Sequence, residues 1–166
     1  MIVCTLGFLF RNGKIILAKK KRKFGVDKWN GYGGVVEKGE NKQECLVREI
    51  KEECGIIVEK KKCKELGCVD FCFEGKSERN MKVYIYRIDE FLGEPKETEE
   101  MGEPREFNVN EIPYHEMIIG DDRFMPFVVE GKNFKGEIHF SVTKEGLLKC
   151  EAFEIKEEIT SEIRIK

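Results

Sequence analysis

The run of residues 33–56, GGVVEKGENKQECLVREIKEECGI, constrains this chain more than any other segment. It begins with two glycines and continues into a charged stretch with the composition of a helix. In such a helix Glu49, Glu52 and Glu53 stand at i, i+3 and i+4 and share an arc of about 100°. Like charges at this spacing repel, so a helix gains from them only if a cation lies between them. Carboxylate oxygens are the ligands that Mg²⁺ prefers. The run therefore predicts a metal site.

The expected helix covers about residues 41–54. Its apolar stripe consists of Leu46, Val47, Ile50 and Cys54. One side of the helix should pack on a sheet while the other faces the metal. Arg48 precedes Glu52 by four residues and can orient it through an ion pair. Gly55 is placed to end the helix as its C′ residue. The alternative is a solvated acidic face, which is common in a chain that is 37% charged.

The spacing of the fixed residues decides between these interpretations. The pattern Gly-x5-Glu-x7-Arg-Glu-U-x-Glu-Glu-x-Gly-U, where U is aliphatic, is matched at every fixed position by Gly34, Glu40, Arg48, Glu49, Ile50, Glu52, Glu53, Gly55 and Ile56. This pattern is the Nudix box, and the chain resembles the Nudix hydrolases. That resemblance implies hydrolysis of a nucleoside diphosphate linked to another moiety, by attack of water on phosphorus. It also implies Mg²⁺ as the cofactor, with Mn²⁺ as a possible substitute.

The resemblance assigns roles within the box. It implies that Glu49, Glu52 and Glu53 are metal ligands, with Glu53 the most important. One of the metal-bound glutamates would take the proton from water, and the sequence leaves open which one. Glycines let the backbone approach a ligand closely, so Gly33 and Gly34 are expected to contact substrate and the Gly33 carbonyl to reach the metal.

A second resemblance concerns the substrate and runs from about Thr5 to Phe140. The segment 19–34, KKKRKFGVDKWNGYGG, and the later Ile-Pro-Tyr, Met and Gly-Asp-Asp residues resemble the MutT-homologue family of oxidised purine nucleoside triphosphate hydrolases. By this resemblance Asn30 reads the purine edge and Phe24 packs against the base. Further substrate-pocket positions are Thr5, Lys20 and Tyr32. Glu100, outside the box, matches an additional metal-shell glutamate.

The adjacent pair Asp121 and Asp122 matches the base-reading aspartates of the same family. Two neighbouring carboxyls in an apolar pocket disfavour double ionisation, so one can remain protonated and donate a hydrogen bond. Such a pair can read both an acceptor and a donor on an oxidised purine. The alternative is that the two acids cap a helix, which is ordinary at a helix start.

One departure from the family affects the base platform. Where the family has a tryptophan that stacks on the base, this chain has the sequence Ile118-Ile119-Gly120, with one residue inserted. Loss of a stacking aromatic weakens base binding by about 1–3 kcal/mol. We therefore expect lower affinity or a different preferred base.

The remaining pattern predicts a mixed sheet between helices, that is, an α/β/α sandwich. Strand-like runs occupy residues 2–10, 14–18, 81–88, 134–142 and 147–155, and residues 56–73 suggest two strands around a polar bulge. Arg11-Asn12-Gly13 indicates a tight hairpin turn. Residues 89–106 suggest an exposed acidic loop, and a helix is expected from Gly120 to Glu130.

Length and composition limit the number of domains, the kind of partner and the cellular compartment. The 166 residues fit one domain, which we take to be a single Nudix hydrolase domain over 1–166. The net charge of −2 argues against a polynucleotide partner, although residues 19–23 form a basic cluster. The seven cysteines include no Cys-x-x-Cys pair, which makes zinc improbable and suits reduced thiols. The apolar N-terminus is too short to span a membrane and reads as a strand. We expect a cytoplasmic monomer.

These observations together predict a Mg²⁺-dependent pyrophosphohydrolase that converts oxidised purine nucleoside triphosphates, such as 8-oxo-dGTP, to the monophosphate and pyrophosphate. One alternative is a Nudix hydrolase of ADP-ribose, a dinucleoside polyphosphate or an RNA 5′ end. The other is a Nudix module that binds nucleotides without hydrolysing them. Such modules usually lose box carboxylates, and none is lost here.

Overall fold

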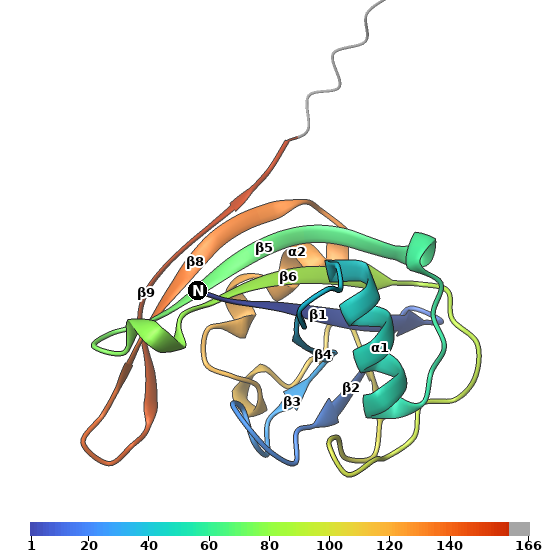
Figure 1. Cartoon of the computed structure of the whole chain (residues 1–166), viewed down its shortest axis with the longest axis horizontal. Helices are drawn as coiled ribbons and strands as arrows, with labels where there is room; N and C mark the ends of the chain where they lie inside the picture. Colours follow the sequence, from blue (N-terminus) through green and yellow to red (C-terminus); the bar gives the residue numbers. More distant parts are fainter. Residues whose placement is uncertain (160–166) are drawn as a thin grey trace, which may run out of the picture.

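The computed structural model describes residues 1–159, and a mixed β-sheet forms its centre (Figure 1). The strand order is β3-β2-β1-β6-β5-β8-β9, with β4 paired to β1 and β7 paired to β2. The pairs β1/β6 and β5/β8 are parallel, and the other pairs are antiparallel. The strands are β1 Ile2–Arg11, β2 Lys14–Lys19, β3 Trp29–Asn30, β4 Tyr32–Val35, β5 Cys63–Phe73, β6 Met81–Ile88, β7 Arg105–Asn108, β8 Phe134–Val142 and β9 Leu148–Glu157.

Two helices lie on the sheet, α1 (Lys42–Cys54) and α2 (Met125–Glu130). Four 3₁₀ turns complete the described elements: η1 Lys60–Lys62, η2 Ser77–Arg79, η3 Tyr114–Glu116 and η4 Asp121–Arg123. Helix α1 packs its apolar stripe into one core cluster, together with Leu9, Tyr32 and Tyr86. Helix α2 belongs to a second, larger cluster with Phe8, Phe71 and Phe134. Alternating strand residues supply the two clusters, so the predicted sheet between helices is confirmed.

The ends of α1 follow from local chemistry. The Asn41 side chain accepts a hydrogen bond from the Glu44 amide at 2.9 Å and caps the helix start. Gly55 adopts a left-handed conformation (φ 78°) and donates its N–H to the Lys51 carbonyl, which ends the helix. The predicted helix and its terminating glycine are therefore confirmed. The predicted turn after β1 is also present, with Asn12 and Gly13 both at positive φ.

Three sequence predictions need correction. Residues 56–73 hold one long strand, β5, preceded by η1, and the irregularity falls at Glu65/Gly67 inside that strand. Residues 89–106 form the predicted exposed loop over most of their length, but β7 begins at Arg105, and Met101 is 1% exposed and forms a bridge with Lys20. The loop therefore reaches the core at Met101. Its acidic composition did not indicate this contact.

The third correction concerns the helix predicted from Gly120 to Glu130. The structure has η4 followed by the short helix α2, joined at Phe124. Pro126 explains the break, since it has no N–H to donate to the preceding turn. The apolar side chains expected on that helix are enclosed, with Phe124 and Val128 fully buried and Phe127 stacked on Phe134.

Within residues 1–159, neither helix has the length and apolar character that crossing a bilayer requires.

Candidate active site

Three carboxylates converge beside the N-terminal end of β4. Oxygen atoms of Glu49, Glu53 and Glu100 all lie within 4.8 Å of one another. Glu49 and Glu53 come from consecutive turns of α1, and Glu100 comes from the segment between β6 and β7. Glu53 is only 5% exposed, while the other two are half-buried. Glu100 thus joins two glutamates that lie 51 and 47 positions earlier in the chain, and the three form one acidic cluster.

The surroundings of Glu53 disfavour its charge. Burial raises its pKa to about 8, although the hydrogen bond from the Gly33 amide to Glu53 Oε1, at 2.8 Å, acts in the opposite direction. The neighbouring charges of Glu49 and Glu100 raise it further. Burial likewise raises the pKa of Glu49. Such a cluster is stabilised by positive charge placed among its oxygens.

The two glycines of β4 allow the sheet and α1 to approach. A Cβ added at Gly33 would lie 1.9 Å from the carbonyl oxygen of Thr5, which is its neighbour on β1. A Cβ added at Gly34 would lie 2.4 Å from Glu49 Oε1. Any side chain at either position would therefore displace the strand or the carboxylate. These glycines are required for close packing, and the ligand contact that the sequence suggested stays a prediction.

Arg48 orders the carboxylates around it. Its guanidinium donates to both oxygens of Glu40, at 2.6 and 3.0 Å, and to Glu49 Oε1 at 2.9 Å. The predicted contact with Glu52 is present at 3.2 Å. Hydrogen bonding from Arg48 lowers the pKa of Glu40 to about 2. The pair with Glu40 is the closest, so Arg48 fastens the glycine-rich loop to α1 and also orients Glu49.

Glu52 lies outside the cluster of converging oxygens. Its side chain is 49% exposed and its described ion pair is with Arg48. Of the three box glutamates predicted as metal ligands, the geometry therefore groups Glu49 and Glu53 with Glu100, and a ligand role for Glu52 stays a prediction.

The segment that carries Glu100 is tied to both sides of the site. Arg22 Nη2 lies 2.7 Å from Glu100 Oε1, and the Lys21 amide donates to the Glu100 carbonyl at 3.0 Å. Thr98 Oγ1 donates to the Glu53 carbonyl at 2.8 Å and lies 3.3 Å from the Glu100 amide. Lys21 and Arg22, which belong to the basic cluster at residues 19–23, thus bind the acidic segment at Glu100. Sequence reasoning missed Thr98, because nothing local distinguishes one threonine in an acidic run.

The donor set suits a hard divalent cation. All three side chains offer carboxylate oxygens, and burial raises the pKa of Glu49 and of Glu53. The half-buried Lys20 is the cation whose charge counters Glu53, and burial lowers the pKa of Lys20 itself. Mg²⁺ and Mn²⁺ prefer such oxygen ligands over nitrogen or sulfur. The residues therefore fit the predicted metal.

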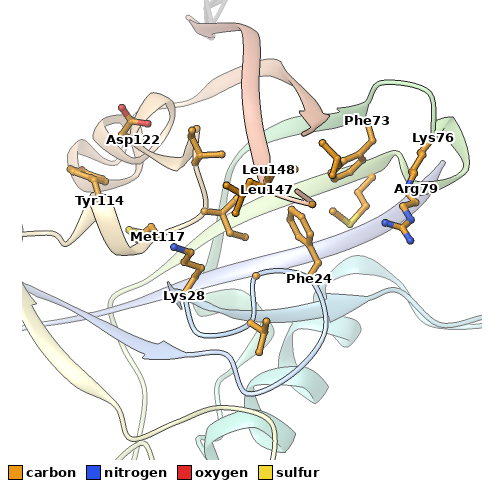
Figure 2. Close-up of a pocket in the computed structure, with 18 of the residues that line it drawn as sticks. Phe24, Lys28, Phe73, Lys76, Arg79, Tyr114, Met117, Asp122, Leu147 and Leu148 are labelled. Carbon is orange, nitrogen blue, oxygen red and sulfur yellow. The ribbon is translucent and has the colours of Figure 1, made fainter. Parts of the chain in front are cut away.

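A pocket of about 1260 Å³ lies on the side of the sheet opposite α1 (Figure 2). Asp122 and Tyr114 stand at one end and Lys76 and Arg79 at the other, as Figure 2 shows. Its wall is largely apolar and includes Phe24, Phe73, Met81, Met117, Leu147 and Leu148. A mostly apolar cavity with a few polar groups is typical of a small-molecule site.

The sequence-predicted pocket residues fall into two groups. Phe24 and Asp122 line the pocket, and Phe24 meets Phe73 edge to face at 5.5 Å. Asp121 is buried, and its Oδ2 has no hydrogen-bond partner among the described residues. Complete burial, followed by the charge of Asp122, raises the pKa of Asp121 well above its usual range. The predicted asymmetry between the two aspartates is thus present in their burial.

The other predicted positions lie deeper. Thr5 is buried, with Oγ1 3.3 Å from Cys45 Sγ on α1, and Asn30 Oδ1 accepts from the Gly31 amide at 2.8 Å. Tyr32 requires correction, because it is fully buried in the core cluster under α1 and takes part in packing. Alternation along β4 turns its ring toward the helix, away from the pocket.

Sequence reasoning also missed the contribution of the β8–β9 hairpin. Val142, Gly146, Leu147 and Leu148, around its turn, line the pocket. The two strand-like runs were recognised, but their sequence does not say over which surface the turn lies. Only the pairing of β8 with β5 brings it there.

Comparisons with known proteins agree with this geometry. Residues 3–128 match the NUDIX domain family. The chain is 38% identical over 136 residues to an oxidized purine nucleoside triphosphate hydrolase of Danio rerio, covering 82% of this chain and 85% of that protein. It is 35% identical, with the same coverage, to the protein of that name from Mus musculus.

A solved structure supports the fold. A mutator MutT protein from Bacillus halodurans superposes with a TM-score of 0.77 at 23% identity, covering 93% of this chain and 97% of the other. With the complete box, the converging carboxylates and the match over residues 3–128, this chain belongs to the Nudix family.

Proposed function

We propose that this protein hydrolyses oxidised purine nucleoside triphosphates to the monophosphate and pyrophosphate with Mg²⁺. The observation that carries the proposal is the Asp121/Asp122 pair, one acid buried and one lining a largely apolar pocket, in a chain with a full Nudix carboxylate cluster. The names of the zebrafish and mouse relatives support the same substrate class.

The residues that would hold the metal are Glu49, Glu53 and Glu100, with the Gly33 carbonyl and Glu52 as further candidates. When bound, Mg²⁺ neutralises polyphosphate charge and lowers the pKa of coordinated water. Lys20 places a positive charge close to Glu53, where the negative phosphates of a substrate would also lie. Arg48 keeps Glu49 oriented, and Thr98 sets the position of Glu100.

The base would be read in the pocket. Burial favours the neutral form of Asp121, whereas Asp122 is exposed. A neutral carboxyl donates a hydrogen bond and a carboxylate accepts one, so the pair can distinguish the edge of an oxidised purine. Phe24 offers its ring to the base. Ile119, also in the wall, replaces the stacking aromatic of the resembled family and limits affinity.

The test is a side-by-side steady-state assay with Mg²⁺ on 8-oxo-dGTP, 2-OH-dATP, dGTP, dATP and ADP-ribose. We expect release of pyrophosphate and the highest kcat/KM for an oxidised purine. Equal kcat/KM for oxidised and normal purines would leave only a general triphosphatase. Cleavage mainly of ADP-ribose would replace the proposal by the alternative Nudix chemistry. Tight binding without hydrolysis of any of them would indicate a binding module.

We further propose that residues 1–166 act as one Nudix domain and as a monomer in the cytoplasm. The family match ends at residue 128, yet β8 pairs with β5 and the β8–β9 turn lines the pocket, so the later strands belong to the same unit. Seven free cysteines suit a reducing compartment. Gel filtration with light scattering, giving the mass of one chain, tests the monomer.

A further inference from the structure

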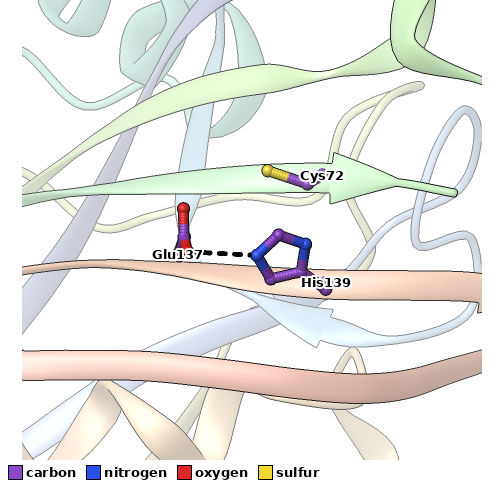
Figure 3. Close-up of side chains that lie close together, drawn as sticks. All are labelled: Cys72, Glu137 and His139. Carbon is purple, nitrogen blue, oxygen red and sulfur yellow. Dashed lines mark ion pairs between the residues drawn. The ribbon is translucent and has the colours of Figure 1, made fainter.

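A second group of potential metal ligands lies on the face of β5 and β8 that points away from the pocket (Figure 3). These strands are parallel, and their register places Cys72 opposite His139. Glu137 precedes His139 by two residues and therefore shares its face. The flanking residues Ile138 and Phe140 point the other way, into the core. Sheet register alone thus assembles a thiol, an imidazole and a carboxylate.

The three groups are close enough to share one ion. Their Sγ, ring nitrogen and carboxylate oxygen atoms all lie within 4.8 Å of one another. Glu137 Oε1 already lies 3.1 Å from His139 Nε2. Zinc bonds of about 2.0–2.3 Å place tetrahedral ligand atoms about 3.3–3.8 Å apart. Small side-chain rotations therefore suffice, and the side chains of Glu137 and His139 are nearly half exposed, so an ion can enter from solvent.

We propose that Cys72, Glu137 and His139 form a Zn²⁺ site with three protein ligands and water in the fourth position. Thiolate and imidazole ligands select zinc over Mg²⁺, which separates this site chemically from the all-oxygen cluster of the active site. The absence of a Cys-x-x-Cys pair made zinc improbable from sequence. The ligands come from strands 65 residues apart, which no local motif reveals.

The electrostatic setting favours a dication. The carboxylates of Glu137 and Asp70 add to the effect of burial in raising the pKa of the Cys72 thiol. Lys82 opposes them but pairs with Asp70 at 2.9 Å.

The site would link β5 directly to β8. Because the β8–β9 turn lines the nucleotide pocket, bound zinc would strengthen the attachment of that wall to the sheet. Its effect is expected on stability, and hydrolysis in Mg²⁺ alone does not require it.

Titration of the full-length reduced protein with Co²⁺ tests the proposal, because a thiolate ligand gives a sulfur-to-cobalt charge-transfer absorption that oxygen ligands do not. We expect one equivalent of this signal, displaced by Zn²⁺. Cys72→Ser should abolish it and His139→Gln should weaken it at least tenfold in affinity. Cys68→Ser, a half-buried thiol on the same strand and face, is the matched control and should leave it unchanged.

Zn²⁺ should also raise the melting temperature of wild type and of Cys68→Ser, but not of Cys72→Ser. Circular dichroism checks that each variant is folded. No charge-transfer signal, or a signal that survives Cys72→Ser or His139→Gln unchanged, overturns the site. Because Cys72→Ser should keep wild-type hydrolysis in Mg²⁺, failure of this proposal is distinguishable from failure of the proposed hydrolase function.

Discussion

The Gly33 amide donates a hydrogen bond of 2.8 Å to Oε1 of Glu53, which joins β4 to the last turns of α1. This bond holds the most buried carboxylate of the cluster with one oxygen engaged by the protein. It also places the backbone of the glycine-rich strand beside the expected metal. The strand and the helix therefore form one structural unit, and changes in either should affect hydrolysis.

Glu53→Gln retains the shape of the side chain and an oxygen that accepts from Gly33, but it removes the charge. Outer-shell substitutions near metals cost 10–100-fold, so losing a charged ligand should lower kcat on the order of 100-fold or more. The assay is steady-state hydrolysis over a Mg²⁺ series, with Glu99→Gln, an exposed acid in the segment of Glu100, as control. A folded Glu53→Gln protein with near wild-type rate in saturating Mg²⁺ would show that the metal assignment is wrong.

Asp121→Asn tests the buried acid through pH. Because the folded protein raises the pKa of Asp121, its contribution to stability is fully present below the unfolded value of about 3.8 and is lost as pH increases through the higher folded value. Asn cannot ionise, so the variant should gain stability relative to wild type as pH rises. Urea denaturation across pH measures this difference, with Asp27→Asn, at an exposed acid outside the pocket lining, as control. A difference that does not vary with pH contradicts the assignment.

Thr98→Ala should loosen the segment that carries Glu100. It removes the hydroxyl that donates to the Glu53 carbonyl and receives the Glu100 and Met101 amides. We expect a loss of about 0.5–1.5 kcal/mol in stability and a higher Mg²⁺ requirement for half-maximal rate. Thr98→Ser keeps the hydroxyl and should restore both. An unchanged Mg²⁺ dependence in Thr98→Ala would separate this hydroxyl from the metal site.

Ile119→Trp should restore a stacking surface in the pocket wall. Ile119 is 46% exposed and lines the pocket, so a larger ring has room toward solvent. Stacking is worth about 1–3 kcal/mol, which corresponds to a decrease in KM of about 5-fold or more. Steady-state kinetics on the preferred purine triphosphate give the value, with Ile119→Leu as a size-matched control. An unchanged or higher KM would count against base binding in this pocket.

Arg48→Ala should destabilise the fold by about 1.5–3 kcal/mol, because charge-assisted hydrogen bonds to Glu40 and Glu49 are lost. Arg48→Lys keeps the charge without the two-point geometry and should recover only part of this. Since Arg48 lowers the pKa of Glu40 to about 2, that contribution is present above about 4.5 and is lost as pH falls toward 2. The gap between wild type and Arg48→Ala in urea denaturation should shrink over that range.

Several elements could be predicted from the sequence because their ends depend on local hydrogen bonds. Asn41, Gly55 and the spacing of the apolar stripe define α1, and Asn12-Gly13 defines the first hairpin. Caps and turns depend on hydrogen bonds within a few residues, so they are visible in sequence. Two predictions from the apolar pattern were wrong. Residues 56–73 hold one strand because of the pairing register of β5, and the helix expected from Gly120 is interrupted because of Pro126.

By itself the sequence determined the family, the reaction chemistry and the helix that bears Glu49 and Glu53, because box residues act at fixed short spacing along one helix. The resemblance had assigned Glu100 to the metal shell, and the tertiary structure places its carboxylate beside those of Glu49 and Glu53. Only the tertiary structure decided that Tyr32 packs in the core and that the β8–β9 turn lines the pocket. It alone also brought Cys72 beside His139. These relationships depend on strand register and on loops that contact residues distant in the sequence. Neither can be inferred from residues that are close together along the chain.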